Sequence, residues 1–290
     1  MIKKGIILAG GYGTRMSPLT KAINKQLLPI YDKPLFYYPL SVFLLSGIKD
    51  ILIIVAKGQL ENFKKVLPNG KNLGIKIQYL EQDKPNGLPE AFILGEKFIS
   101  NKPVALILGD NFFYGQSLTG KIKECLKLNK GAKIFLHPVN NPSSFGVVKL
   151  KNNRIVKILE KPKKFISNLA ITGLYFFDKN VVNFSKKLVP SKRKELEIID
   201  LLKIYKIKNK LSFEMLGRGG TWLDTGSIDD FISTSNFVQT IEKRQGFKIG
   251  CLEEISYKNK WINKKQVIQN IKFYGKCLYS EYLQYLINNK

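Results

Sequence analysis

The stretch Leu8-Ala9-Gly10-Gly11-Tyr12-Gly13-Thr14-Arg15 follows the apolar run Gly5-Ile6-Ile7 and decides how the rest of the chain is interpreted. A short β-rich run that ends in glycines predicts a strand whose carboxyl end lets backbone N–H groups approach a phosphate chain. Glycine is also the usual residue of an ordinary tight turn, so both interpretations stand at this point. Two common phosphate motifs are absent, since Met16 replaces the third glycine of a dinucleotide fingerprint and no Gly-Lys-Ser/Thr follows.

Outward from this stretch, apolar strands alternate with amphipathic helices. The alternation predicts an α/β fold with a Rossmann-like, mixed, mostly parallel sheet flanked by helices and followed by a helical C-terminal section. The expected strands cover 5–9, 51–55, 75–79 and 104–108, the expected helices 38–45, 60–67, 89–98, 228–244 and 279–287, and a hairpin covers 145–159. Because no linker or repeat divides the 290 residues, we expect one domain, with a core over 1–227 and the helical section over 228–290.

The formal net charge of +26 first suggests a nucleic-acid or anionic-membrane binder. The lysines are scattered from Lys3 to Lys290 without a basic block, which favours a solvated surface suited to polyphosphate substrates. No apolar stretch approaches the roughly 20 residues of a membrane helix, and the first apolar run stops at Gly10. We therefore expect a cytoplasmic protein with neither a nucleic acid nor a membrane as partner.

Charged side chains mark a candidate phosphate and metal site. Arg15 offers a delocalised cation for a triphosphate, and Lys25 offers a second, compact one. Asp110 directly follows the strand over 104–108, at the sheet edge where such folds bind ligands, and Asp224 lies in a separate loop. Two carboxylates together with triphosphate oxygens suit Mg²⁺. For either aspartate alone, a helix cap or turn is the better interpretation.

These motifs together resemble the nucleotidyltransferases that act on sugar 1-phosphates, and the resemblance covers essentially the whole chain. The segments that carry it, in the order expected for the family, are 10–20, 25–35, 82–92, 108–115, 160–162, 172–176, 195–198 and 222–226. Residues 31–34, 110–115 and 242–246 are most similar to the short thymidylyltransferase branch. The resemblance implies transfer of a thymidylyl group from dTTP, or a uridylyl group from UTP, to glucose 1-phosphate with release of pyrophosphate, as the first step of deoxysugar synthesis.

The resemblance also implies which residues form the site. Asp110 and Asp224 converge and hold Mg²⁺ as the cofactor, and Arg15, Lys25 and Lys161 act in catalysis. The residues implied in nucleotide binding are Leu8, Gly10, Gly11, Gly13, Thr14, Arg15, Gln26, Gln82, Pro85, Gly87, Leu88 and Asp110. Those implied in binding the sugar phosphate are Asn111, Gly146, Glu160, Lys161, Ile171, Tyr175 and Arg193.

A general base is not needed for this reaction. A phosphate monoester has a second pKa of about 6, so a sugar 1-phosphate attacks the α-phosphorus as a dianion. This agrees with a chain whose single histidine is His137. We expect the amide of Gln82, as donor and acceptor, and the backbone of Gly87 to pair with the O4 and N3–H edge of a pyrimidine, while Pro85 and Leu88 sandwich it.

Three positions depart from the family pattern. Phe145 replaces a tyrosine, Glu90 a glutamine and Ile199 a threonine, so the sequence leaves sugar selectivity open. A uridylyltransferase, a non-catalytic regulatory subunit that binds nucleotide sugars and, last, a nucleic-acid-binding protein are the alternatives.

The resemblance further implies a regulated assembly. It predicts a homotetramer with a second nucleotide site between subunits, near Tyr114, Gly115, Arg218 and Ile255. Gln116 stands where a histidine is expected at that site, which would weaken end-product inhibition.

Overall fold

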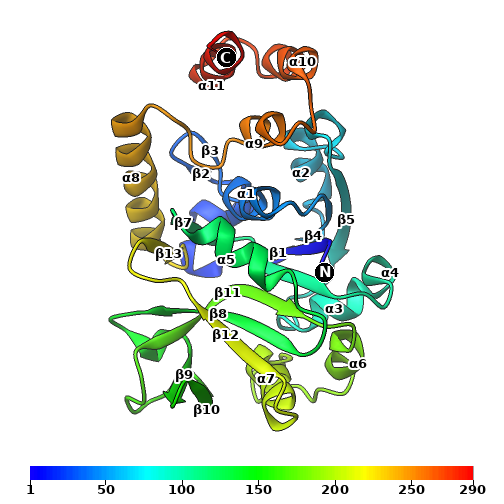
Figure 1. The fold of residues 1–290 in the computed structure, drawn as a ribbon, viewed down its shortest axis with the longest axis vertical. Helices are drawn as coiled ribbons and strands as arrows, with labels where there is room; N and C mark the ends of the chain where they lie inside the picture. The colour runs from blue at the N-terminus through cyan, green and yellow to red at the C-terminus, as the bar shows by residue number, and fades with distance from the viewer. Residues whose placement is uncertain (290) are drawn as a thin grey trace.

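The protein is described here by a computed structural model in which residues 1–289 are placed. A mixed sheet with strand order β10-β9-β11-β6-β1-β4-β5 forms its centre, and β8 joins β11 to β12 (Figure 1). The strands of one half are β1 (Lys4–Ala9), β4 (Asp50–Ala56), β5 (Lys76–Gln82) and β6 (Val104–Leu108). These four strands pair in parallel, and the predicted strands at 5–9, 51–55, 75–79 and 104–108 are confirmed.

The other half of the sheet is largely antiparallel. Its strands are β8 (Ala132–Pro138), β9 (Gly146–Lys151), β10 (Arg154–Glu160), β11 (Leu169–Phe177) and β12 (Leu211–Met215). The predicted hairpin is β9 and β10, joined by Asn152 and Asn153 with φ of 49° and 56°. Positive φ at both positions is the geometry of a two-residue hairpin turn, and asparagine tolerates it better than most residues. The fold class expected from the sequence, a mixed sheet between helices, is therefore confirmed.

Helices cover both faces of the sheet (Figure 1). They are α1 (Tyr37–Ser46), α2 (Leu60–Val66), α3 (Glu90–Leu94), α4 (Glu96–Ile99), α5 (Leu118–Cys125), α6 (Val181–Ser185) and α7 (Ile198–Ile207). The single helix expected over 89–98 is wrong, because α3 and α4 are separate helices that meet at Gly95. A side chain at Gly95 would lie 2.8 Å from the Ala91 carbonyl oxygen and 3.1 Å from Leu52, so this close approach to the sheet admits only glycine.

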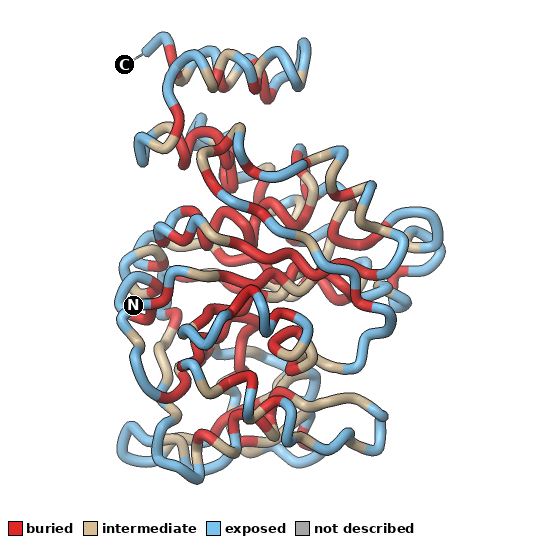
Figure 2. The backbone as a smooth tube through the Cα atoms, turned by 90° about the vertical axis from the view of Figure 1, so that its right-hand side faces the viewer, coloured by how far each residue is buried: buried red, intermediate tan, exposed pale blue. Residues whose placement is uncertain are grey.

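The C-terminal section consists of α8 (Ile228–Gln245), α9 (Leu252–Lys258), α10 (Lys264–Tyr274) and α11 (Leu278–Asn288). In Figure 1, α8 runs along one side of the molecule and α10 and α11 form its far end. Figure 2 shows buried backbone concentrated in the sheet layer and more exposed backbone at this end. The helices expected over 228–244 and 279–287 are confirmed as α8 and α11, whereas α9 and α10 were not anticipated.

Buried polar contacts fasten this section together. Glu253, at the start of α9, accepts hydrogen bonds from the hydroxyl groups of Tyr274 (2.7 Å) and Tyr279 (2.6 Å). Lys33, 2% exposed, pairs with Glu242 of α8 at 2.9 Å and with the neighbouring Asp32. A buried lysine and a buried glutamate that pair across the chain link α8 to the turn between β2 (Pro29–Ile30) and β3 (Lys33–Pro34).

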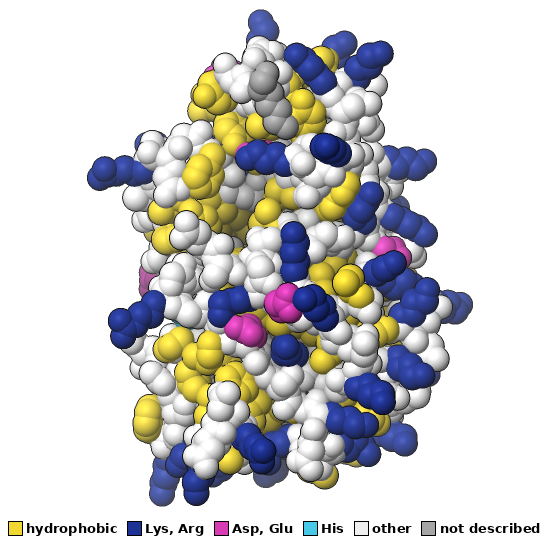
Figure 3. Space-filling view, viewed as in Figure 1, with side chains coloured by type: hydrophobic (Ala, Val, Ile, Leu, Met, Phe, Trp, Pro, Cys, Tyr) yellow, Lys and Arg dark blue, Asp and Glu magenta, His cyan; other side chains and the backbone are white. Residues whose placement is uncertain are grey.

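The surface carries the excess positive charge. On the face drawn in Figure 3, lysines and arginines are spread over the whole outline and acidic side chains are few. This distribution agrees with the scattered lysines of the sequence. Within residues 1–289, no helix combines the length and the apolar character that a membrane span requires.

Candidate active site

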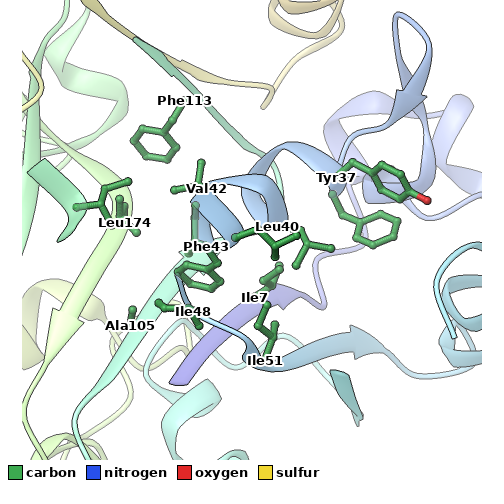
Figure 4. Close-up of a cluster of buried hydrophobic side chains, with 14 of the residues drawn as sticks. Ile7, Tyr37, Leu40, Val42, Phe43, Ile48, Ile51, Ala105, Phe113 and Leu174 are labelled. Atoms are coloured by element: carbon green, nitrogen blue, oxygen red, sulfur yellow. The ribbon is translucent and has the colours of Figure 1, made fainter. Parts of the chain in front are cut away.

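A packed core supports the sheet edge that carries the site. Figure 4 shows Leu40 and Phe43 of α1 over Ile7 of β1, with Ala105 of β6 beside them. Each of these side chains is fully buried. A side chain at Gly5 would lie 2.6 Å from the Phe43 ring, so the helix rests directly on the backbone of β1. The core thus packs α1 against β1 and β6, and the candidate residues follow the carboxyl ends of both strands.

A two-stranded ribbon brings the two aspartates together. β7 (Asn111–Gly115) begins directly after Asp110, and β13 (Gly220–Asp224) ends at Asp224. The two strands are antiparallel, with Asp224 opposite Asn111. The backbone N–H and the hydroxyl of Thr225 both donate to the Asp110 carbonyl, at 3.2 and 2.8 Å. Both carboxylates line one cleft, as the sequence predicted.

The two carboxylates have opposite electrostatic surroundings. Burial alone raises the pKa of Asp110, but Lys25 and the Asn111 amide outweigh it and hold the pKa below its ordinary value. Burial and the charge of Asp110 raise the pKa of Asp224 to about 6, against the opposing effects of Lys25 and Arg15. Two adjacent carboxylates, one of which raises the pKa of the other, form a hard oxygen donor set that fits a divalent cation. Three or more potential metal ligands do not cluster anywhere in residues 1–289, so substrate oxygens and water would complete the coordination.

The side chain of Asn111 is fixed from three directions. Its Oδ1 accepts hydrogen bonds from the indole N–H of Trp222 (2.6 Å) and from the backbone N–H of Gly173 (3.0 Å). Its Nδ2 consequently faces Asp110 and donates to Oδ1 at 3.0 Å. A side chain at Gly173 would lie 2.4 Å from Asn111 Oδ1, so only glycine permits this contact. Trp222 thus determines how Asn111 presents its amide to the aspartate.

The cleft has two compartments that meet at Gly87, Leu88, Leu108, Asp110 and Glu195. The first, here called the Asp224 compartment, has a volume of about 270 Å³. The residues that line it and that the sequence predicted as site residues are Arg15, Gly87, Leu88, Asp110, Asn111, Gly146, Glu160, Lys161, Ile171, Tyr175, Arg193 and Asp224. The second, the Gln82 compartment, has a volume of about 200 Å³. The residues that line it and that the sequence predicted as site residues are Leu8, Gly11, Gln26, Gln82, Pro85, Gly87, Leu88 and Asp110.

The other predicted residues, Gly10, Gly13, Thr14 and Lys25, do not line either compartment; Gly10 and Lys25 are buried, whereas Thr14 is exposed. A side chain at Gly10 would come within 2.2 Å of Gln82 Oε1, and one at Gly13, where φ is 62°, within 3.0 Å of the Lys25 side chain. The loop glycines thus allow the glycine-rich loop to approach both side chains closely.

Arg15 follows the glycine-rich loop in the sequence and lies beside Asp224 in the structure. A side chain at Gly226 would be 2.9 Å from Arg15 Nη2 and 3.1 Å from Asp224 Oδ2, so both groups border the same glycine. The guanidinium faces the Asp224 compartment, where it is available to an anionic ligand.

Charged groups gather at the far end of the Asp224 compartment. Burial raises the pKa of Glu160, and the charges of Lys161 and Arg193 oppose this rise. Lys161 follows β10 with φ of 41°, a left-handed conformation that is strained for lysine. Arg193 donates to both carboxylate oxygens of Glu197, at 2.7 and 3.1 Å, and its Nη2 lies 3.9 Å from Glu160. This end has the acceptors and cations that a sugar phosphate would require.

Several lining residues were not predicted as site residues. They are Leu108, Ser144, Phe145, Gly173, Glu195, Leu196, Glu197, Ile198, Ile199 and Trp222. Most belong to motif segments already recognised in the sequence, which was the available signal. Two of the departures from the family pattern lie here, since Phe145 packs on Trp222 at 5.1 Å between ring centroids and the Ile199 side chain fills the space beside Gly146.

That Gln82 offers the base both a donor and an acceptor stays a prediction, and part of its amide is engaged within the chain. One of the two N–H bonds of Gln82 Nε2 donates to Glu90 Oε2, so Oε1 and the second N–H stay available to a ligand. Nearby, Gln26 Oε1 is buried and has no partner within the described chain. Both amide side chains line the Gln82 compartment, and an unpaired buried acceptor favours a ligand that donates a hydrogen bond.

The residues implied for a second nucleotide site lie outside this cleft. Tyr114 and Gly115 end β7, Gly115 pairs with Gly220 just after Arg218, and Ile255 lies on α9. The Tyr114 hydroxyl donates to Gln245 of α8 at 3.4 Å.

Paired aspartates at the carboxyl edge of such a sheet suit an enzyme that binds phosphates through a divalent cation. The family model described as nucleotidyl transferase matches residues 4–241, and the chain belongs to this family. It is 48% identical over 285 residues to the glucose-1-phosphate thymidylyltransferase of Neisseria meningitidis, covering 98% of this chain and 99% of that protein. It is 43% identical over 288 residues to the enzyme of the same name from Mycolicibacterium smegmatis, covering 99% and 100%.

Solved structures give the same result for the fold. A Bacillus anthracis structure described as a glucose-1-phosphate thymidylyltransferase with sucrose matches with a TM-score of 0.76 and 36% identity, over 81% of this chain and 94% of that one. A UDP-glucose pyrophosphorylase in complex with UDP-glucose matches with a TM-score of 0.70 and 28% identity, over 83% of this chain and 100% of that one.

Proposed function

We propose that the protein transfers a thymidylyl group from dTTP to α-D-glucose 1-phosphate, giving dTDP-glucose and pyrophosphate. One observation carries the proposal: Asp110 lies where two compartments of a single cleft meet, with Asp224 in one of them. The Gln82 compartment is lined by amide side chains, and the Asp224 compartment by Glu160, Lys161 and Arg193. A base and a sugar phosphate would then occupy separate ends, with the reacting phosphates at the junction. Relatives with this activity in their name, alignable over nearly the whole chain, support the assignment.

Asp110 and Asp224 would hold a divalent cation, and Mg²⁺ is the ion that we propose. When bound, Mg²⁺ supplies positive charge to the nucleotide phosphates. Two carboxylates are the usual protein share of such a site. The raised pKa of Asp224 supports this assignment, because a cation would compensate the two neighbouring negative charges.

The remaining residues align the reaction and balance its charge. Lys161 would guide the attacking oxygen of the sugar phosphate, while Arg15 and Lys25 would stabilise the charge that accumulates on the departing pyrophosphate. Glu160 would accept hydrogen bonds from sugar hydroxyls. The attacking oxygen is already deprotonated, so none of these residues needs to remove a proton.

The test is pyrophosphate release over a grid of nucleotides and sugars. Purified protein with Mg²⁺ would be offered dTTP, UTP, CTP, ATP and GTP against the 1-phosphates of glucose, galactose, mannose and N-acetylglucosamine. The expected result is strong release with dTTP, somewhat weaker release with UTP, and glucose 1-phosphate as the best acceptor. ATP as the best donor would contradict the base assignment. No release in any combination would support a regulatory, non-catalytic subunit.

We further propose that residues 1–290 form one folding domain and that the protein assembles as a homotetramer. Contacts such as Lys33 with Glu242 tie the C-terminal section to the core and support the single domain. Sedimentation velocity at micromolar concentration tests the assembly, and a monomer there would contradict it.

A further inference from the structure

We infer that Glu90 is a specificity residue, which orients the Gln82 amide so that the base site accepts uracil or thymine and rejects cytosine. The inference rests on the proposed function, because it assigns the Gln82 compartment to the base. The inference also goes beyond the proposed function, since Glu90 itself does not line either compartment. Its effect is exerted through Gln82.

The orientation of Gln82 follows from what Glu90 can accept. A carboxylate only accepts hydrogen bonds, so the NH₂ group of Gln82 must face Glu90 and the oxygen must face away. Gln82 is 3% exposed, and its Oε1 lies where a side chain on Gly10 would be, beside the Gly11 wall of the compartment. No donor within residues 1–289 reaches that oxygen. The pairing therefore turns the Gln82 oxygen away from Glu90 and occupies one of the two N–H bonds of Nε2.

Glu90 is itself held firmly. Its Oε1 accepts a hydrogen bond from Asn86 Nδ2 at 2.7 Å, and its Oε2 lies 3.4 Å from the backbone N–H of Asn86. Asn86 is fixed in turn, because its carbonyl accepts from Leu196 N at 2.7 Å. A glutamine at position 90 could either donate or accept, and would leave both orientations of Gln82 open. The carboxylate removes this choice.

The hydrogen-bonding pattern of each base decides whether it fits this orientation of the Gln82 amide. Uracil and thymine carry a donor at N3, whereas cytosine carries an acceptor there and an amino group in place of O4. The Gln82 oxygen pairs with the first pattern and repels the second. Gly87 lines the same compartment, and its backbone N–H donates no hydrogen bond within the described residues, so it is available to O4 of uracil or thymine. Cytosine would leave both groups unpaired.

The experiment compares UTP with CTP in the wild type and in Glu90→Gln. The readout is the ratio of kcat/KM for the two nucleotides, with glucose 1-phosphate held constant. We expect the ratio to fall roughly tenfold in Glu90→Gln, as one mispaired hydrogen bond is relieved. Glu96→Gln removes a carboxylate from the next helix, where it pairs with Lys186, and should leave the ratio unchanged. An unchanged ratio in Glu90→Gln would overturn the inference.

A double-mutant comparison separates orientation from a structural effect. In a Gln82→Ala background, adding Glu90→Gln should not change the UTP to CTP ratio further, because the group that Glu90 orients is gone. A full tenfold change there would overturn the proposed route through Gln82. Calorimetric titration of UTP and CTP into the same variants gives the ratio without turnover. A Glu90-dependent binding preference in a protein that releases no pyrophosphate would uphold the inference and contradict the proposed reaction.

Discussion

Lys25 Nζ lies 2.8 Å from Asp110 Oδ2, and the lysine side chain is 4% exposed. The segment that follows the glycine-rich loop thus places a buried cation, Lys25, next to the Asp110 carboxylate. The pairing holds the pKa of Asp110 below its ordinary value despite burial. Lys25 thereby favours the charged form of Asp110, while the pKa of Asp224 beside it is raised to about 6.

Replacing Lys25 should move the acid limb of the activity profile. Lys25 lowers the pKa of both Asp110 and Asp224, so Lys25→Met should raise both pKa values. As the pH falls, Asp224 is protonated first, since its pKa is about 6, and activity in the variant should therefore disappear at a higher pH than in the wild type. Turnover at neutral pH should fall as well. The measurement is kcat/KM from pH 5 to 9. Lys121→Met, which breaks a pair with Glu214, is the control and should keep the wild-type profile.

Asp110→Asn and Asp224→Asn should each lower turnover by about a hundredfold or more, because each removes a carboxylate from the proposed metal site. Manganese binding, followed by electron paramagnetic resonance in the presence of dTTP, should weaken in both variants. Asp200→Asn is the matched control, since Asp200 pairs with Lys203 on the surface of α7. Near-normal activity and metal binding in either site variant would remove that residue from the site.

Trp222→Phe tests the support of Asn111. The ring contact with Phe145 is kept, but the 2.6 Å hydrogen bond to Asn111 Oδ1 is lost, and the amide becomes freer to turn away from Asp110. We expect kcat to fall on the order of tenfold, with a higher metal concentration needed for half-maximal rate. The KM for dTTP should change little. A variant with wild-type kcat and metal dependence would show that Gly173 alone orients Asn111.

Glu242→Ala should destabilise the protein by on the order of 3 kcal/mol, because it removes one partner of the buried Lys33. Glu96→Ala breaks the exposed pair with Lys186 and should cost less than about 1 kcal/mol. Both values come from urea unfolding followed by circular dichroism. If the C-terminal section and the core form one domain, the destabilised variant should still unfold in a single transition.

His137→Ala should leave turnover within about twofold of the wild type, because the proposed mechanism requires no proton transfer. His137 lies against Trp222 with 6.4 Å between ring centroids, and burial lowers its pKa, so it is suited to packing as a neutral ring. The assay is pyrophosphate release at pH 7.5. A loss of a hundredfold, with the melting temperature unchanged, would contradict a reaction without a general base.

Local patterns in the sequence predicted much of the framework. The apolar runs that became β1, β4 and β6 are buried along nearly their whole length, so their composition marks them as central parallel strands, whereas β5 at the sheet edge alternates buried and exposed residues. Asn152-Asn153 between alternating runs was sufficient for the hairpin, because the turn depends on the backbone preferences of those two residues. Asp110 could be assigned to the sheet edge since it directly follows a strand.

The sequence by itself determined the family, the order of the elements and most of the residues around the cleft, because these depend on short motifs and on hydrophobic period. Only the tertiary structure decided which side chains pair across the chain. Three features depend on how closely neighbouring elements pack: the hydrogen bond from Trp222 to Asn111, the ion pair of Lys33 with Glu242, and the break between two helices at Gly95. Glu90 and Gln82 are close in sequence, yet their contact depends on the turn between β5 and α3. A hydrogen bond acts over about 3 Å, so its existence is settled by packing that no local pattern encodes.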